Sequence, residues 1–500
     1  MKPWSLSLKI YFGLVMFLFV LLFSPLVLSF RVGINSGDKV PKMELTAALD
    51  RWIPRLMKLY RVPGVSIALL RNGETFFLEG YGLANRNSDT AVTPDTIFQV
   101  GSISKSLTAW GIMRLVENGE IDLDNPVEMY LTGWDFPPSD YSSSQVTVRR
   151  LLSHTAGLPR VIFEDPPPGS DPSGPAVLLS LNSAGAIVSE PGSTFRYSNA
   201  GYTVLELLVQ EVAGESFEDY MQASVLNPLG MNTSSFYHRD EWSLRLATGY
   251  RYDGSAVPVK PMSVKAAGGL RTTVRELSRF AEAGMKAWHG SSAVLTQQSV
   301  KELYTPESKM EGLLYRAAAD SYGLGHFIET SPSGAVMISH GGENEGWISH
   351  YCIVPCTGDG ILILTNSERS HHLVASVIGR WARLSGFGTP RMSRVINAVS
   401  WQFALLIAAI TASTLLSFRI AAVRLFKFFI GEKPGTRVLS HTLLPAVGLA
   451  AGLLAGIFAS RSSLLVFFPI LSALLPPVCF GFAGSMLLLL LFQAPRSNPS

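Results

Sequence analysis

Polar and apolar residues alternate along this chain with two different periods. Alternation with period two, which is typical of half-buried strands, predicts strands at 65–70, 75–79, 322–329, 336–339, 347–354 and 361–365. A period near 3.6 predicts helices at 45–60, from 102 onward, and at 203–213, 216–225, 274–287, 296–304 and 371–384. Strands therefore lie at both ends of the region and helices lie in the middle. We expect an α+β fold (an α/β sandwich), with one antiparallel sheet flanked by helices and an inserted helical subdomain.

Long apolar stretches flank this region on both sides. Residues 10–30 carry no charge and follow Lys2 and Lys9, a pattern that fits either a signal peptide or an uncleaved signal anchor. After Arg394, the stretches 396–418, 442–460 and 464–492 are each long enough to cross a bilayer. We therefore predict three transmembrane helices at 396–492, in addition to the amino-terminal segment.

Charged residues predict the topology of these spans. The segment 419–441 contains five basic residues and one acid, so the positive-inside rule places it in the cytoplasm. The predicted organisation is a signal segment at 1–30, an extracytoplasmic domain at 31–395, the spans, and a cytoplasmic tail at 493–500. That is a multi-pass protein of the cell membrane with the lipid bilayer as a partner. The net charge is only +3, and its basic excess is concentrated in the membrane-flanking loop, which argues against nucleic-acid binding.

Candidate chemistry begins with Ser102 and Lys105, which open one of the predicted helices. Residues three apart lie on one helix face, one turn from each other. The lysine amine can then remove the serine proton, provided that burial or a neighbour keeps the amine partly neutral. A serine three residues before a lysine often occurs by chance, so this pair indicates catalysis only together with other motifs.

Three further clusters accompany the pair. Tyr197 and Asn199 precede a predicted helix, where a tyrosine can shuttle protons and an amide can orient a carbonyl or the lysine; a simple helix cap is the alternative. His340, at the end of a predicted strand, is followed by two glycines that allow a close approach of backbone; a tight turn is the alternative. His154 suggests a Ser-His pair, but we expect it to cap and pack a helix end.

The order Ser-x-x-Lys, Tyr-x-Asn, His-x-Gly resembles that of the serine hydrolases of the β-lactamase and penicillin-binding protein superfamily. It is most similar to the class C β-lactamase-like branch, which includes D-Ala-D-Ala carboxypeptidases, D-aminopeptidases and esterases. The resemblance covers roughly residues 43–385. Supporting phrases are Val-Pro-Gly-Val at 62–65, Gly-Tyr-Gly at 80–82, Leu-Ser-His-Thr-Ala-Gly-Leu-Pro at 152–159, Pro-Leu-Gly-Met at 228–231, Gly-Gly-Leu at 268–270 and Leu-Thr-Asn at 364–366.

The resemblance implies a covalent mechanism and a set of site residues. Ser102 would attack a carbonyl, and Lys105 with Tyr197 would move its proton, first from the serine and then to the leaving group. The amides of Ser102 and Glu343 would form the oxyanion hole, and water would release the acyl-enzyme. The implied substrate-binding residues are Asn199, His340, Gly342 and Glu343. No metal ion or organic cofactor is called for.

Two departures from the family pattern bear on the substrate. Gly341 stands where a hydroxyl residue commonly helps to bind a substrate carboxylate, and Glu343 and Glu345 bring two acids to the mouth of the site. Strong β-lactamase activity is therefore not expected. We expect hydrolysis of ester, amide or peptide bonds in small acyl, ester or peptide substrates, cell-wall peptides among them. The alternative is a non-catalytic membrane sensor that binds cell-wall fragments or β-lactams.

Overall fold

The structure is a computed structural model that describes residues 39–160, 185–242, 245–259, 262, 264–291, 294–430 and 469–491. The chain divides into two compact units. One unit is Gly33–Ser393, and the other combines the two ends of the chain.

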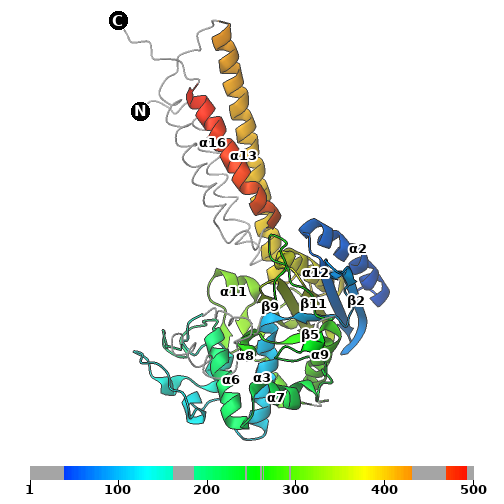
Figure 1. The fold of residues 1–500 in the computed structure, drawn as a ribbon, viewed down its shortest axis with the longest axis vertical. Helices are drawn as coiled ribbons and strands as arrows, with labels where there is room; N and C mark the ends of the chain where they lie inside the picture. The colour runs from blue at the N-terminus through cyan, green and yellow to red at the C-terminus, as the bar shows by residue number, and fades with distance from the viewer. Residues whose placement is uncertain are drawn as a thin grey trace. The chain divides into compact units, whose positions relative to one another are not determined.

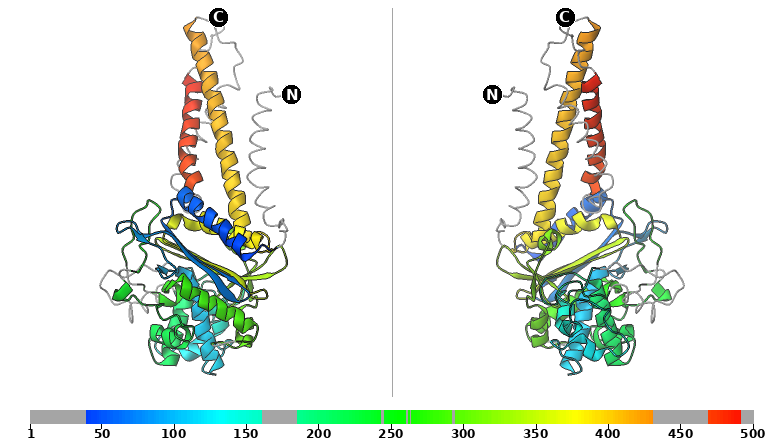
Figure 2. Two further views of the ribbon diagram at one scale, coloured as in Figure 1. Left: turned by 90° about the vertical axis from the view of Figure 1, so that its right-hand side faces the viewer. Right: turned by 90° about the vertical axis from the view of Figure 1, so that its left-hand side faces the viewer.

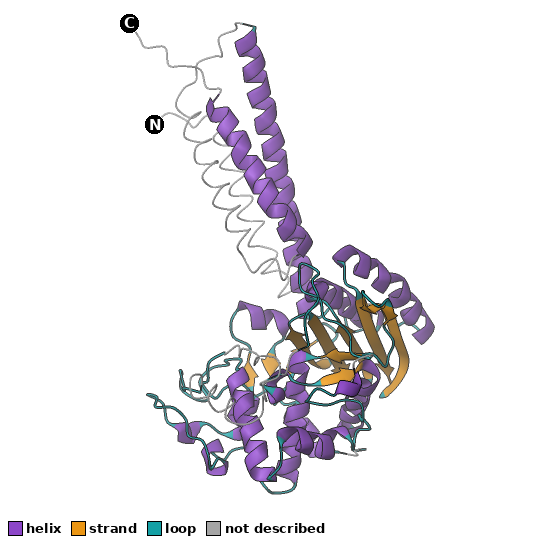
Figure 3. Ribbon diagram, viewed as in Figure 1, coloured by secondary structure: helices purple, strands orange, loops and turns teal. Residues whose placement is uncertain are grey.

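The larger unit is built on a nine-stranded antiparallel sheet, in the order β3-β2-β1-β11-β10-β9-β8-β7-β6. Its strands are β1 (Gly64–Arg71), β2 (Glu74–Asn85), β3 (Thr90–Ala91), β6 (Ser308–Lys309), β7 (Ser321–Tyr322), β8 (Phe327–Thr330), β9 (Val336–Asn344), β10 (Trp347–Val354) and β11 (Asp359–Thr365). Figure 1 labels β2, β11 and β9 of this sheet, and Figure 3 colours the strands orange. The predicted α+β sheet made from amino- and carboxy-terminal pieces is confirmed, because β1 pairs with β11.

The centre of the sheet follows from the period-two pattern. Every residue of β1 is buried, and its side chains alternate between two cores. Ile67 and Leu69 pack in one core, whereas Ala68 and Leu70 pack in the other. The hairpin from β1 to β2 turns at Asn72 and Gly73, both with positive φ, as the Asn-Gly signal predicts.

Helices cover both faces of this sheet (Figure 2). On one face lie α2 (Lys42–Tyr60) and α12 (His371–Leu384), the helices predicted at 45–60 and 371–384. On the other face lie α3 (Ser104–Glu117) and α9 (Val274–Trp288). The α9 helix starts at a side-chain cap, since Thr273 accepts the amide of Glu276.

The remaining elements lie mostly between β4 (Ile97–Gln99) and β6 in the chain. β4 pairs with β5 (Arg271–Thr273) in a separate two-stranded sheet. The helices here are α4 (Val148–Leu152), α6 (Asn199–Ala213), α7 (Phe217–Met221), α8 (Lys265–Gly268), α10 (Gln297–Leu303) and α11 (Leu313–Ala318), with short turns η1 (Gly101–Ile103), η2 (Val127–Tyr130), η3 (Ser143–Gln145), η4 (Gln222–Leu226), η5 (Asp240–Trp242) and η6 (Glu368–Ser370). They form the helical region that the sequence predicts as an insertion.

Among the described residues, the smaller unit contains α16 (Pro469–Leu491) and, from Arg394 onward, α13 (Arg391–Phe429). Within the part of the chain that the structure describes, no helix combines the length and the apolar character that a bilayer crossing requires. The prediction of transmembrane helices is therefore wrong for these residues. Hydropathy counts apolar residues but does not show where a helix ends: α13 continues past residue 418 through Arg419, Arg424 and Lys427, which the prediction placed in a loop. The stretches 10–30 and 442–460 lie outside the described residues.

Candidate active site

Ser102 lies in the short η1 turn that connects β4 to α3. Lys105 lies in the first turn of α3 and is fully buried. The Lys105 Nζ is 3.2 Å from the Ser102 Oγ, so the two side chains meet as the spacing of three predicts. Ser102 stays partly exposed, which leaves its hydroxyl open to a substrate.

Lys105 has two further partners, and both are carbonyl oxygens. Its Nζ donates to the main-chain oxygen of Ala267 at 2.7 Å and to the Oδ1 of Asn199 at 2.9 Å. Burial lowers the pKa of Lys105 well below its usual value, and the positive charge of Arg160 lowers it further. The amine is therefore held by hydrogen bonds but is biased toward its neutral form.

Tyr197 and Asn199 flank the residue that caps α6. Ser198 accepts the amide of Gly201 at 3.1 Å, as an N-cap does, and donates its hydroxyl to the oxygen of Pro159 at 2.8 Å. The helix-cap interpretation is therefore correct for Ser198. Because the cap fixes this loop, Asn199 reaches Lys105 and the Tyr197 hydroxyl bonds to Ser102.

Burial decides the ionisation of Tyr197. A nearby cation would lower its pKa, and Lys105 Nζ lies 4.9 Å from the Tyr197 ring centroid. Burial nevertheless raises the pKa of Tyr197, and the hydrogen bond with Ser102 and the charge of Arg160 offset this only in part. Tyr197 is therefore a neutral phenol at ordinary pH, able both to donate and to accept a hydrogen bond.

His340 lies inside β9, not at its end, because the strand continues to Asn344. The imidazole is buried: its Nε2 is 3.0 Å from the Tyr322 hydroxyl, and its Nδ1 is 2.6 Å from the oxygen of Gly341. A carbonyl only accepts, so Nδ1 carries the proton and Nε2 accepts from Tyr322. Burial lowers the pKa of His340 well below its usual range. The side chain is therefore neutral.

The two glycine positions bring β9 against the turn that carries Ser102. Gly101 has φ of +49°, and a Cβ there would lie 2.5 Å from the amide nitrogen of Glu343. A Cβ on Gly342 would lie 1.8 Å from the oxygen of Val100. Only glycine permits this approach. It brings the Glu343 amide beside the nucleophile turn, where an oxyanion donor belongs, although the role itself stays a prediction.

The two acids near the site have different partners. The Glu345 carboxylate pairs with Arg251 at 2.6 Å, and the Glu343 carboxylate lies 3.8 Å from the His371 imidazole. The hydrogen bond from His371 lowers the pKa of Glu343. Arg160 is exposed, yet its charge influences Lys105, Tyr197 and Glu343. Glu345 is therefore paired with a cation, whereas Glu343 stays an ionised carboxylate near the site.

His154 packs beside the site and is not a base for Ser102. It follows α4 with a left-handed backbone (φ +59°), and its Nδ1 accepts the amide of Ser198 at 3.1 Å. Its ring centroid lies 4.2 Å from that of Tyr197. This agrees with the prediction that His154 packs a helix end.

Sequence reasoning missed four contributors. The oxygen of Ala267 binds Lys105, Tyr322 fixes His340, Tyr315 stacks on Tyr197 with centroids 5.6 Å apart, and Arg160 supplies a cation. A main-chain oxygen has no signal in the sequence, because any residue supplies it. Arg160 directly follows the 152–159 phrase, and that proximity was the one available signal.

Comparison with known proteins shows which family this geometry belongs to. The beta-lactamase family model matches residues 49–382, which is more than half of the chain. The chain belongs to the beta-lactamase family. The resemblance inferred from the motifs is therefore confirmed at the level of the serine hydrolase superfamily.

Curated relatives and solved structures match about two thirds or more of this chain at 23–27% sequence identity. Protein flp of Staphylococcus aureus (strain N315) is 23% identical over 390 residues, covering 77% of this chain and 76% of its own. The octameric penicillin-binding protein homologue from Pyrococcus abyssi is 27% identical, with a TM-score of 0.56, covering 67% of this chain and 77% of its own. A class C beta-lactamase is 24% identical with a TM-score of 0.56, covering 67% of this chain and 94% of its own, which shows the shared fold.

Proposed function

We propose that this protein hydrolyses ester, amide or peptide bonds through an acyl-enzyme on Ser102. The observation that carries the proposal is the set of three partners around the Lys105 amine. A neutral amine has two hydrogens and one lone pair. Two partners, the oxygens of Ala267 and Asn199, can only accept, and the third, the Ser102 hydroxyl, accepts from an ammonium but donates to a neutral amine, the form that burial favours. The environment therefore suits an uncharged Lys105 whose lone pair faces the serine hydroxyl.

The steps follow from this arrangement. The Ser102 Oγ gives its proton to the Lys105 amine and forms a bond to the substrate carbonyl carbon, whose π electrons move to the oxygen. The amides of Ser102 and Glu343 stabilise that oxyanion. As the carbonyl re-forms, the bond to the leaving group breaks, and the proton reaches that group from Lys105 by way of Tyr197. Water then repeats the sequence on the acyl-enzyme and releases the acid.

Tyr197 is suited to relay this proton. Its hydroxyl bonds to Ser102, and its ring lies under the Lys105 amine. Because burial keeps the phenol neutral, it can pass one proton on while it accepts another, with no net change in charge.

The substrate class follows from what lines the site. Gly341 supplies no hydroxyl, and His340 is neutral, so these two positions of β9 offer a substrate carboxylate neither a hydroxyl nor a positive charge. Strong β-lactamase activity is therefore not proposed. Among the described residues, Arg160 is a cation whose charge reaches Lys105, Tyr197 and Glu343, and it favours small acyl or peptide substrates with an anionic group.

The first test uses the full chain and Ser102→Ala as its matched control. Hydrolysis of p-nitrophenyl acetate, of a D-alanyl-D-alanine peptide and of benzylpenicillin is followed, with the intact protein mass measured in each reaction. We expect ester or peptide hydrolysis and a transient acyl adduct in the wild type only. Equal rates for the two proteins on all three substrates would exclude the proposal, and efficient penicillin turnover would overturn the assigned substrate class.

The alternative is a non-catalytic sensor that binds its ligand without hydrolysing it. Its support would be binding of a β-lactam or cell-wall peptide by wild type and Ser102→Ala alike, with no turnover.

A further inference from the structure

Glu206 is a buried carboxylic acid on the same helix as Asn199. It lies seven residues further along α6, which places it on the same face two turns away. Its side chain is 2% exposed, and its Oε2 accepts the amide of Ala266 at 2.9 Å. None of the three sequence motifs contains this residue.

The segment that Glu206 holds is α8, whose next carbonyl binds Lys105. The Ala267 oxygen accepts the Lys105 Nζ at 2.7 Å, one residue after the amide that Glu206 accepts. α6 therefore contacts Lys105 twice, directly through Asn199 and indirectly through Glu206 and α8.

Glu206 substitutes for a missing helix cap. Val264 precedes α8 and makes no side-chain cap, and α8 is only four residues long, too short to be stable by itself. Glu206 accepts the amides of both Lys265 and Ala266. A second side chain, Thr108, donates to the oxygen of Ala266 at 2.9 Å.

The charged groups that face Glu206 are Lys265 and Glu218, which pair with each other in a nearly buried ion pair. Burial raises the pKa of Glu206 to about 7, the hydrogen bond from Ala266 and the charge of Lys265 oppose the rise, and Glu218 adds to it. Both protonation states are therefore populated near neutral pH. An ionised carboxylate accepts amide hydrogen bonds roughly twice as strongly as a neutral acceptor.

We propose that Glu206 is a positioning residue for Lys105: its carboxylate holds α8 so that the Ala267 carbonyl orients the amine toward Ser102. This inference rests on the proposed function and adds a residue to it. It predicts that activity falls when Glu206 takes up a proton, because the turn that holds the Ala267 carbonyl is then less firmly fixed.

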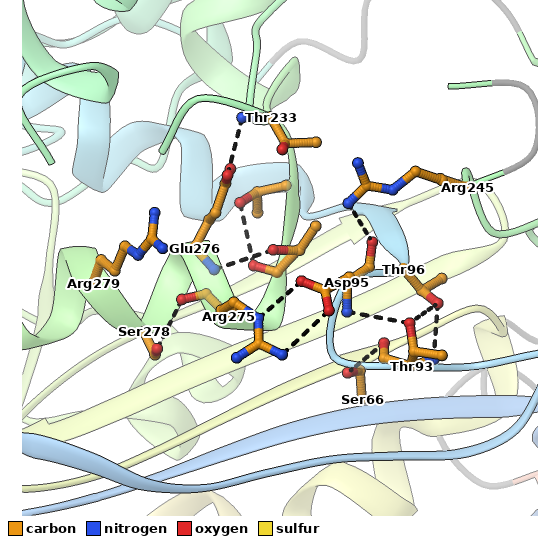
Figure 4. A network of polar contacts seen from close by, with 12 residues as sticks. Ser66, Thr93, Asp95, Thr96, Thr233, Arg245, Arg275, Glu276, Ser278 and Arg279 are labelled. Atoms are coloured by element: carbon orange, nitrogen blue, oxygen red, sulfur yellow. Dashed lines mark hydrogen bonds and ion pairs between the residues drawn. The ribbon is translucent and has the colours of Figure 1, made fainter. Parts of the chain in front are cut away.

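The test compares Glu206→Gln with Glu276→Gln. Glutamine keeps the shape and one acceptor oxygen but neither the charge nor the titration. Glu276 is a matched control, because it is also buried and accepts two main-chain amides, those of Thr233 and Ser234 at 2.9 and 2.8 Å, but it lies on α9 (Figure 4).

The readout is kcat/KM of the full chain for p-nitrophenyl acetate between pH 5.5 and 9. We expect the wild type and Glu276→Gln to lose activity below an apparent pKa of about 7. Glu206→Gln should be about tenfold slower at pH 8, mostly in kcat, and should lack that inflection. A Glu206→Gln profile that keeps the wild-type inflection would overturn the inference.

Failure of the proposed function is distinguishable from failure of this inference. If the wild type hydrolyses esters no faster than Ser102→Ala, the proposed function fails. In that case, or if Glu206→Gln does not fold, crystal structures of the wild type at pH 5.5 and 8.5 test the positioning role of Glu206. A longer separation between the Ala267 oxygen and Lys105 Nζ at the lower pH supports positioning, and an unchanged 2.7 Å overturns it.

Discussion

Replacing Gly101 with alanine should lower both the stability of the fold and kcat. Gly101 precedes the nucleophile and has φ of +49°, a left-handed conformation that costs a non-glycine residue about 1–2 kcal/mol. The new Cβ would also lie 2.5 Å from the amide nitrogen of Glu343, whereas ordinary contacts begin at 3.4 Å. β9 must therefore retreat by about 0.9 Å, and crowding of this kind typically costs about 1–3 kcal/mol more.

The retreat moves the amide that we assign to the oxyanion hole. Loss of one such donor lowers kcat by about 10²–10³, and a displacement near 1 Å costs about 10². We therefore expect Gly101→Ala to lower kcat for p-nitrophenyl acetate about 100-fold, with a total loss of about 2–5 kcal/mol of unfolding free energy.

A matched control is Gly73→Ala, at a turn with φ of +77° and no atom within 4 Å of the new Cβ. It carries the backbone cost of about 1–2 kcal/mol without the clash, so kcat should not change. Urea denaturation and ester hydrolysis at 25 °C measure the two quantities. A folded Gly101→Ala variant with kcat within threefold of the wild type would refute the placement of the Glu343 amide.

Three further predictions concern the ionisable groups. Tyr197→Phe should lower kcat by about 10²–10⁴ with little change in KM, because only the proton relay is removed; steady-state kinetics against Ser102→Ala as the inactive baseline checks it. Arg160→Ala should raise KM about two- to fivefold for substrates with a carboxylate, but not for neutral esters. Arg160→Lys should return KM for the carboxylate substrates toward the wild-type value at low salt. An equal effect on both kinds of substrate would contradict the role assigned to Arg160. The folded pKa of Glu206 is about 7 against an ordinary 4.5, so the folded chain keeps a proton that the unfolded chain has lost. The unfolding free energy of the protein should therefore fall by about 3 kcal/mol as the pH rises from 4.5 to above 7. Urea titrations should show that this fall is absent in Glu206→Gln.

The sequence was most informative where local pattern decides structure. β10 and α12 have the predicted bounds, because their periodicity is uninterrupted and their ends carry clear signals. β9 is longer than predicted, since two glycines and an asparagine are typical of a turn. Here they form a strand because the Val100 oxygen and the neighbouring β10 occupy the space that side chains would fill.

Only the parts of the candidate site that are made by particular side chains could be predicted from the sequence. Ser102, Lys105, Tyr197 and Asn199 come together as their motifs suggest. The Ala267 oxygen could not be predicted, because its role depends on where α8 lies and not on its side chain. The neutrality of His340 depends on its burial beside Tyr322, which is set by tertiary packing.

The pairing of β1 with β11 has a consequence for how the chain is made. Val65 pairs with Thr365, so the centre of the sheet joins residues that leave the ribosome far apart in time. At about 5–20 residues per second, the interval is about 15–60 s. During that time the apolar β1 has β2 on one side and an unpaired edge on the other, which exposes backbone groups that can pair with other chains. Nascent chains truncated before β11 should therefore be the ones that aggregate or recruit chaperones.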